Sequence, residues 1–277
     1  MKTSKASAEA YAAGTVVNAL STGKGSTFAL NVRTRAEVEK SDELELLSEG
    51  KQVSPEILKA ILEKLGIDEC VRAKVESNIP RGSGLGSSSA LVNSLILAVC
   101  RLFGIELEDV EILRLNAKVS LECGMSFTGA MDDAGASLLG GFVVTDNESM
   151  ELIRHDVEER GSRAAILVPR WGRSEVSLEK MRSGDTSIVD AAFELAREGL
   201  YCEAMKLNSD YCCAVLGYPD EPVRVAEKAG LCAGLSGNGP AYVAYGTSQA
   251  LGKIMGEWTK FGRVILTTIP RVPSYEL

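Results

Sequence analysis

The sequence feature that most constrains the fold is a glycine-serine segment between an expected strand and an expected helix. Residues 80–90 read PRGSGLGSSSA. Apolar and polar residues alternate from Val71 to Glu76, the pattern of a half-buried strand, and Pro80 ends it. From Leu91 to Phe103 apolar residues recur at three- and four-residue steps, which predicts a helix with a wide apolar face. The chain must therefore place a glycine-rich turn at the start of a packed helix.

This segment has the chemistry of a phosphate-binding loop. Glycines lack Cβ atoms, so successive N–H groups can converge on one anion, and a helix N-terminus adds unpaired N–H groups and partial positive charge. The serines of the first helical turn supply hydroxyl donors and a candidate metal ligand. The alternative is a loop that only caps a buried helix. The residues expected to contact phosphates are Pro80, Arg81, Gly82, Ser83, Gly84, Leu85, Gly86, Ser87, Ser88 and Ser89.

The remainder of the chain predicts an α+β fold in two halves. At about 150 residues per domain, 277 residues suggest one large domain or two small ones. The first third is rich in strand patterns, helical patterns dominate residues 176–229, and strands flank a helix at 248–260. We expect one lobe at residues 1–155 and a second at 156–277.

Composition and charge limit the kinds of partner that we expect the chain to bind. A net charge of −8 argues against non-specific nucleic-acid binding. The most apolar stretch, residues 90–105, contains Asn93, Ser94 and Arg101 and is too short and polar to span a bilayer. Seven cysteines without a C-x-x-C spacing indicate reduced thiols rather than a disulfide framework. We therefore expect a cytoplasmic protein with a small-molecule partner, no nucleic acid and no membrane; the sequence does not report its oligomeric state.

Three segments together resemble the GHMP kinases, the superfamily of galactokinase and of homoserine, mevalonate and phosphomevalonate kinases. Residues 80–90 resemble the ATP-phosphate loop of these enzymes. Residues 14–25 (GTVVNALSTGKG) resemble their N-terminal motif, and residues 234–241 (GLSGNGPA) resemble their C-terminal glycine loop. Within the superfamily, residues 18–30 and 126–141 are most similar to archaeal-type shikimate kinases.

The resemblance implies a fold and a reaction. The fold would have an N-terminal lobe like domain 2 of ribosomal protein S5 and a ferredoxin-like C-terminal lobe. The reaction would transfer the γ-phosphoryl of ATP to the 3-hydroxyl of shikimate, giving shikimate 3-phosphate and ADP in aromatic amino-acid biosynthesis. The alternatives are another small-molecule kinase of the superfamily, for homoserine or mevalonate, and an inert nucleotide-binding regulator on the same fold.

Two adjacent carboxylates are the candidate catalytic groups. Asp132 and Asp133 lie among small and apolar residues; read without the resemblance, they could equally be a pair stabilised at a helix N-terminus. The resemblance implies a catalytic Asp seven residues before a Gly-Gly pair, which is Asp133, and Asp132 stays an alternative. It also implies a metal-binding Glu eleven residues upstream, so that Ser88 and Glu122 would hold Mg²⁺ between the ATP phosphates.

Lys24 and two loops complete the expected site. A lysine beside an aspartate keeps the carboxylate ionised and stabilises charge on transferring oxygens, although Lys24 could equally be an exposed loop residue. The residues expected on the substrate side are Asn18, Gly23, Ser236, Gly237, Asn238 and Gly239. A carboxylate substrate also needs a cation, preferably the bidentate guanidinium of arginine. The sequence leaves five candidates open, namely Arg33, Arg81, Arg170, Arg173 and Arg271.

Overall fold

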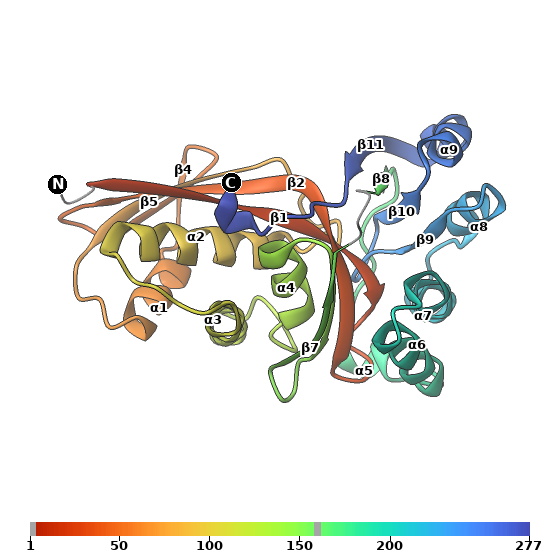
Figure 1. Ribbon diagram of the computed structural model, residues 1–277, viewed down its shortest axis with the longest axis horizontal. Helices are drawn as coiled ribbons and strands as arrows, with labels where there is room; N and C mark the ends of the chain where they lie inside the picture. Colours follow the sequence, from red (N-terminus) through yellow and green to blue (C-terminus); the bar gives the residue numbers. More distant parts are fainter. Residues whose placement is uncertain (1–3, 158–161) are drawn as a thin grey trace.

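Two β-sheets, each covered by helices, build the two lobes of the molecule (Figure 1). The structure is a computed structural model and describes residues 4–157 and 162–277. The helices and strands mix in each lobe, so the expected α+β class is confirmed.

The first sheet has the order β4-β3-β5-β2-β6-β7, and β1 pairs with β2. Its pairings are antiparallel except for the parallel pair of β3 and β5. In β5 the side chains of Val71, Ala73 and Val75 are buried, as the alternation predicts. The strands are β1 (Lys5–Val17), β2 (Lys24–Lys40), β3 (Glu45–Ser48), β4 (Lys51–Val53), β5 (Val71–Ser77), β6 (Phe142–Asp146) and β7 (Glu151–Asp156).

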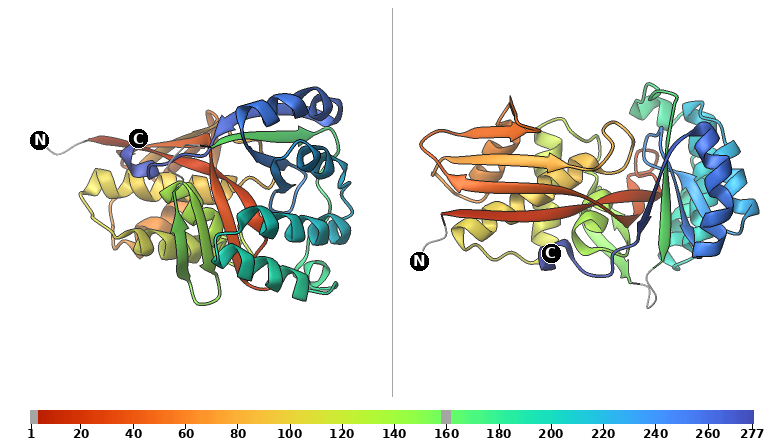
Figure 2. Two further views of the ribbon diagram at one scale, coloured as in Figure 1. Left: turned by 45° about the vertical axis from the view of Figure 1, so that its right-hand side comes forward. Right: turned by 90° about the horizontal axis from the view of Figure 1, so that it is seen from above.

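The hairpin of β1 and β2 is long enough to run through both lobes (Figure 2). One end packs against the helices of the first lobe, and the other end adds Val16, Val17 and Leu20 to the apolar core of the second lobe. The strand β1 is rich in alanine and contains Gly14, where an added Cβ would lie 2.8 Å from the ring of Phe28. Small residues therefore let this strand pack closely on its neighbours.

Helices cover one face of the first sheet (Figure 1). The longest, α2, begins at Ser87, inside the glycine-serine segment, and buries residues in the core of this lobe. The helix α1 starts one residue after Pro55, which takes the N-cap position without a side-chain hydrogen bond. The helices are α1 (Glu56–Lys64), α2 (Ser87–Phe103), α3 (Asp109–Glu122) and α4 (Met131–Leu139).

The second lobe is a four-stranded antiparallel sheet of order β11-β8-β10-β9 with helices packed on it (Figure 2). Its elements are β8 (Arg163–Pro169), α5 (Leu178–Met181), α6 (Ser187–Arg197), α7 (Tyr201–Leu216), α8 (Glu221–Lys228), β9 (Cys232–Leu235), β10 (Tyr242–Gly246), α9 (Ser248–Phe261) and β11 (Gly262–Thr268). No helix within the described ranges combines the length and the apolar character needed to cross a bilayer.

The end of the chain returns from the second lobe to the first (Figure 1). The N–H of Gly141 donates to the carbonyl of Pro270 at 2.8 Å, and the guanidinium of Arg101 donates to the carbonyl of Tyr275 at 2.7 Å. A short 3-10 helix, Ser274–Glu276, ends the chain there. The last residues therefore belong structurally to the lobe in which the chain began.

One pair of cysteines differs from the expectation of free thiols. Cys202 at the start of α7 and Cys232 at the start of β9 form a disulfide, with their Cα atoms 4.9 Å apart. The packing of α7 on β9 brings together two residues that are 30 positions apart in the sequence. The expectation of reduced thiols was therefore wrong for this pair, whereas Cys70, Cys100, Cys123, Cys212 and Cys213 are free.

Candidate active site

A pocket of about 300 Å³ lies where the three glycine-containing segments meet. The first segment comes from the β1–β2 hairpin, the second from the start of α2, and the third from the loop between β9 and β10. The pocket is lined by Thr15, Asn18, Ala19, Leu20, Gly82, Gly84, Leu85, Gly86, Ser87, Ser88, Ser89, Ser120, Met125, Ser126, Phe127, Thr128, Ala130, Asp132, Asp133, Arg173, Gly237 and Asn238.

Direct hydrogen bonds hold the three segments together. The Ser236 hydroxyl donates to the carbonyl of Gly84 at 2.8 Å and accepts from the N–H of Thr15 at 3.3 Å. The Thr15 hydroxyl in turn accepts from the N–H of Gly237 at 2.7 Å. Because each segment contacts the other two, the pocket wall is one connected structure although the segments lie far apart in sequence.

The turn before α2 has the backbone conformation that its glycines allow. Gly82, Gly84 and Gly86 all have φ between +63° and +79°. Gly86 is the N-cap of α2 and carries no side chain, so the free N–H groups of the first helical turn are accessible from the pocket. Together with the helix dipole, these groups form a binding site for anionic oxygens.

The two carboxylates of α4 face different surroundings. Asp132 is buried, and its Oδ1 accepts a hydrogen bond from Asn147 Nδ2 at 2.9 Å. A Cβ on Gly25 would lie 2.4 Å from its Oδ2, so this carboxylate packs against the start of β2. Asp133 instead faces the turn before α2, because a Cβ on Gly86 would lie 3.3 Å from its Cγ. Asp133 is therefore the carboxylate beside the expected phosphate loop.

Burial dominates the acid–base behaviour of this pair. Removal from water raises the pKa of Asp132, while hydrogen bonds from Asn147 and from the backbone oppose the shift. Removal from water, followed by repulsion from the neighbouring Asp132, holds the pKa of Asp133 well above its usual range. A carboxyl group with a raised pKa is a stronger proton acceptor once it is ionised, which suits general-base chemistry.

One of the five candidate arginines, Arg173, lines the pocket. Its guanidinium has no ion pair with any side chain in the described part of the chain. The segment that carries it is held by Tyr218, whose hydroxyl accepts from the N–H of Ser174 at 2.6 Å and donates to the carbonyl of Asn238 at 3.3 Å. Tyr218 therefore fixes the arginine segment relative to the C-terminal glycine loop.

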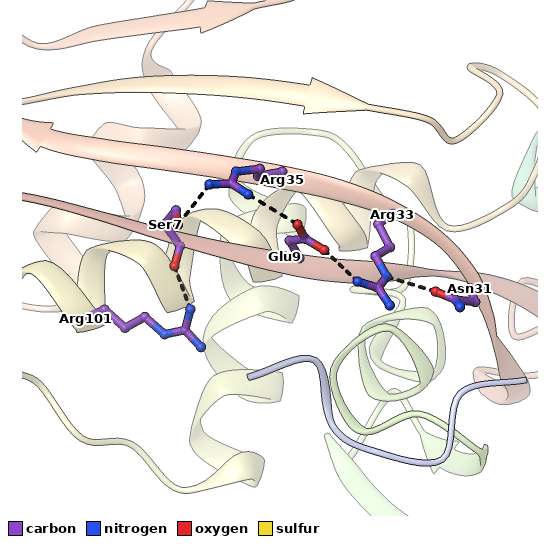
Figure 3. Close-up of polar contacts among 6 residues, drawn as sticks. All are labelled: Ser7, Glu9, Asn31, Arg33, Arg35 and Arg101. Atoms are coloured by element: carbon purple, nitrogen blue, oxygen red, sulfur yellow. Dashed lines mark hydrogen bonds and ion pairs between the residues drawn. The ribbon is translucent and has the colours of Figure 1, made fainter. Parts of the chain in front are cut away.

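Three other candidate arginines are engaged elsewhere. Figure 3 shows Arg33 on the hairpin of β1 and β2, where its guanidinium pairs with Glu9 at 2.8 Å and bonds Asn31 at 2.9 Å. Arg81 contacts Ser48 of β3 at 3.1 Å. Arg170 bonds the carbonyl of Lys260 at 3.4 Å. These three arginines and Arg271 are absent from the pocket lining.

Two predicted site residues are absent from the pocket lining. Glu122 is exposed and forms an ion pair with Lys64 of α1. It follows Ser120, which does line the pocket, by two positions, and two positions on a helix turn the side chain by about 200°. Lys24 lies over the ring of Phe193 of α6, with its Nζ 5.6 Å from the ring centroid. Neither side chain lines the pocket, and the metal role of Glu122 and the catalytic role of Lys24 stay predictions.

The remaining predicted residues surround the pocket without lining it. Gly23 accepts from the N–H of Asn147 at 2.9 Å, and thus ties the hairpin to the neighbour of Asp132. The Ser83 hydroxyl bonds the carbonyl of Pro80 at 2.5 Å and closes the turn. The N–H of Gly239 donates to the carbonyl of Ser236 at 2.9 Å and shapes the third loop. These residues act on the shape of the loops.

Sequence reasoning missed several functional neighbours. Asn147 holds Asp132 but follows a strand in a position that resembles an ordinary turn residue. Ser120 and the segment 125–128 line the pocket opposite the phosphate loop. For Ser120, the available signal was a polar residue among the apolar residues of α3.

Comparisons with known proteins find relatives of this chain. Residues 53–141 match the GHMP kinases N-terminal domain family. The chain is 46% identical to a shikimate kinase of Archaeoglobus fulgidus, over 98% of this chain and 95% of that protein. It is 37% identical to a shikimate kinase of Methanocella arvoryzae, over 96% of this chain and 94% of that protein.

The fold matches solved structures of the same superfamily. Methanococcus jannaschii mevalonate kinase superposes with a TM-score of 0.76 at 17% identity, covering 98% of this chain and 100% of that chain. Homoserine kinase from Cytophaga hutchinsonii gives 0.70 at 21% identity, with 98% of both chains covered. These likenesses establish the fold, and the archaeal relatives establish the family. The chain therefore belongs to the GHMP kinases, in the family of the archaeal shikimate kinases.

Proposed function

We propose that this chain is a shikimate kinase that transfers the γ-phosphoryl of ATP to the 3-hydroxyl of shikimate. The observation that carries the proposal is the position of Asp133, a carboxylate with a raised pKa that lies beside the glycine turn of α2. A proton acceptor next to an anion-binding helix N-terminus is the arrangement that phosphoryl transfer to an alcohol requires. The 46% identity to the Archaeoglobus fulgidus shikimate kinase supports the choice of acceptor.

Different residues of the pocket have different roles in the proposed reaction. The N–H groups between Gly82 and Ser89 bind phosphate oxygens, and the dipole of α2 offsets their charge. Asp133 accepts the proton of the substrate hydroxyl, or orients that hydroxyl, as the γ-phosphoryl group is transferred. Asn18, Gly237 and Asn238 form the wall that faces the acceptor, and the amide of Asn18 bonds both the carbonyl of Gly237 and the side chain of Asn238. Positioning and electrostatics supply most of the rate enhancement.

The donor atoms of the pocket fit a magnesium ion. Serine hydroxyls at the start of α2 and the carboxylates of α4 are hard oxygen donors, and Mg²⁺ commonly takes few protein ligands beside phosphates and waters. Ser88 lines the pocket and would hold the ion. The carboxylate of Glu122 forms an ion pair with Lys64 and does not line the pocket. When bound, Mg²⁺ would neutralise charge on the phosphates.

Arg173 is the proposed partner of the shikimate carboxylate. Replacing it in Arg173→Met keeps most of the side-chain length and removes the charge-assisted hydrogen bonds, so we expect the KM for shikimate to rise about 10- to 100-fold. The KM for ATP should stay within about twofold, measured by ADP release.

The matched control for that prediction is Arg170→Met, because Arg170 is three residues away and bonds the carbonyl of Lys260 outside the pocket. We expect this control to leave the KM for shikimate unchanged. The Arg173 variant should also lose the preference for shikimate over its neutral amide. An unchanged KM in Arg173→Met would show that the carboxylate is bound elsewhere.

The acceptor is tested directly with [γ-³²P]ATP and three alcohols, namely shikimate, mevalonate and homoserine. We expect label transfer to shikimate alone, with shikimate 3-phosphate as the product. Transfer only to mevalonate or homoserine would keep the kinase mechanism and refute the acceptor. Binding of ATP without transfer to any of the three would favour the inert nucleotide-binding regulator.

A further inference from the structure

Two fully buried asparagines connect the helix of the phosphate loop to the helix of the carboxylates. Asn93 lies on α2 and Asn116 on α3, and both side chains are 0% exposed. Asn116 Nδ2 donates to Asn93 Oδ1 at 2.7 Å and to the carbonyl of Ser89 at 3.0 Å. Asn93 Nδ2 donates to the carbonyl of Ala134 at 2.9 Å. Ser89 is in the first turn of α2, and Ala134 directly follows Asp133.

The chain of bonds reaches the pocket itself. Asn116 Oδ1 accepts from the hydroxyl of Ser120 at 3.1 Å, and Ser120 lines the pocket. Both N–H groups of the Asn116 amide are used, and its oxygen is used as well. Reversing either amide would set oxygen against oxygen or nitrogen against nitrogen, so the network fixes one orientation for each side chain.

Burying these two amide side chains among apolar residues would destabilise the fold if their hydrogen bonds were not formed. The neighbours of the pair include the fully buried Val92, Leu95, Ile96 and Leu113, where leucine would pack without any polar group to satisfy. A buried amide contributes little net stability even when it is bonded, and it is strongly destabilising when a partner is lost. Hydrogen bonds between helices fix the orientation of the helices and the distance between them more strictly than apolar packing does.

We propose that Asn93 and Asn116 are positioning residues that set the distance between the first turn of α2 and the first turn of α4. This distance is the one between the phosphate oxygens and Asp133 in the reaction proposed above, on which the inference rests. Catalytic groups must be held to within about 0.5 Å of their productive geometry. The pair therefore acts on the chemical step through Asp133 and touches no substrate atom.

The test compares Asn93→Leu, Asn116→Leu and the double variant with Ser94→Ala. Ser94 is the matched control because it is the next residue on α2, is equally buried, and donates only to the carbonyl of Leu91 in its own helix. We expect each single asparagine variant to lower kcat about 10- to 100-fold, with the KM values for ATP and shikimate within about threefold. The double variant should match the singles, because the pair works as one unit.

Two outcomes would overturn the inference. One is a lower unfolding midpoint with an unchanged kcat per folded molecule, which a purely structural pair would give. The other is a crystal structure of Asn93→Leu in which α4 keeps its position relative to α2, or shifts no more than in Ser94→Ala. We expect a shift of at least about 0.5 Å in Asn93→Leu only. If the wild type phosphorylated none of the three alcohols, the proposed function would fail, and the helix positions in these crystals would still decide the inference.

Discussion

Asp133→Asn is expected to lower kcat for shikimate phosphorylation by about 10³-fold. The substitution keeps the size of the side chain but removes the proton acceptor beside the turn of α2. Binding of ADP should stay within a few-fold of the wild type or become tighter, because the change removes negative charge near the phosphates. Steady-state ADP release gives kcat, and calorimetry gives the nucleotide affinity.

Asp132→Asn is the comparison that separates the two carboxylates. An amide at position 132 can still accept the hydrogen bond from Asn147, and Asp133 stays in place. We expect Asp132→Asn to retain most of the turnover. The loss of its charge should also move the acidic limb of kcat/KM to lower pH, because repulsion from Asp132 contributes to the raised pKa of Asp133. A large loss of kcat in Asp132→Asn, with near-normal turnover in Asp133→Asn, would reverse the assignment.

Asp133→Asn should also be more stable than the wild type at neutral pH. Burial raises the pKa of Asp133 above that of an unfolded aspartate, about 3.9, so ionisation of this group opposes folding at every pH above its folded pKa. The cost fades as pH falls through that folded pKa and is gone below about pH 4. Urea denaturation should therefore show a stability gain for Asp133→Asn at pH 7 that disappears at pH 4.

Gly84→Ala should destabilise the protein by about 4 kcal/mol or more and abolish measurable ADP binding. A Cβ at this position would lie 2.2 Å from the carbonyl oxygen of Ser236 and 3.1 Å from the N and O atoms of Gly239. These contacts are all backbone atoms of the facing loop, so no side chain can rotate away to make room. The new methyl group would force apart the two loops that the Ser236 hydroxyl holds together.

Gly82→Ala provides the matched control within the same turn. Gly82 also has a positive φ, +64° against +79° for Gly84, but a Cβ there meets nothing within 4 Å. Its substitution should cost only the strain of the left-handed conformation, about 1–2 kcal/mol, and should lower ADP affinity much less than Gly84→Ala does. Urea unfolding and calorimetry measure both quantities. Equal effects of the two substitutions would show that backbone strain, and not the loop contact, governs this site.

The parts of the site that sequence could predict are those governed by local rules. The alternation before Pro80 and the periodicity after Leu91 set the turn at a strand-to-helix junction, and the observed β5 and α2 have that form. The alternative interpretation, that Asp132 and Asp133 form a pair at a helix N-terminus, also depended on near neighbours, and α4 begins at Met131. Spacing of a few residues carries this information because it determines backbone conformation directly.

The parts that sequence could not determine depend on helix phase and on distant contacts. A count of eleven residues from Asp133 to Glu122 crosses the loop before α4, so it does not determine which face of α3 the glutamate occupies. The pairing of Cys202 with Cys232 and the choice of Arg173 both require the tertiary fold. The strand β1 was not predicted, because alanine and glycine lack the β-branched side chains that are typical of strands. Its pairing with β2 identifies it in the structure.

The shared hairpin of β1 and β2 limits how such a protein can be reassembled during evolution. Residues near the N-terminus complete the interior of the later half, and residues near the C-terminus rest on the earlier half. A recombination junction near residue 155 would therefore separate Val16 and Leu20 from the neighbours with which they are packed. Acceptor preference in such a scaffold can diverge through point substitutions in loops more readily than through exchange of whole halves between relatives.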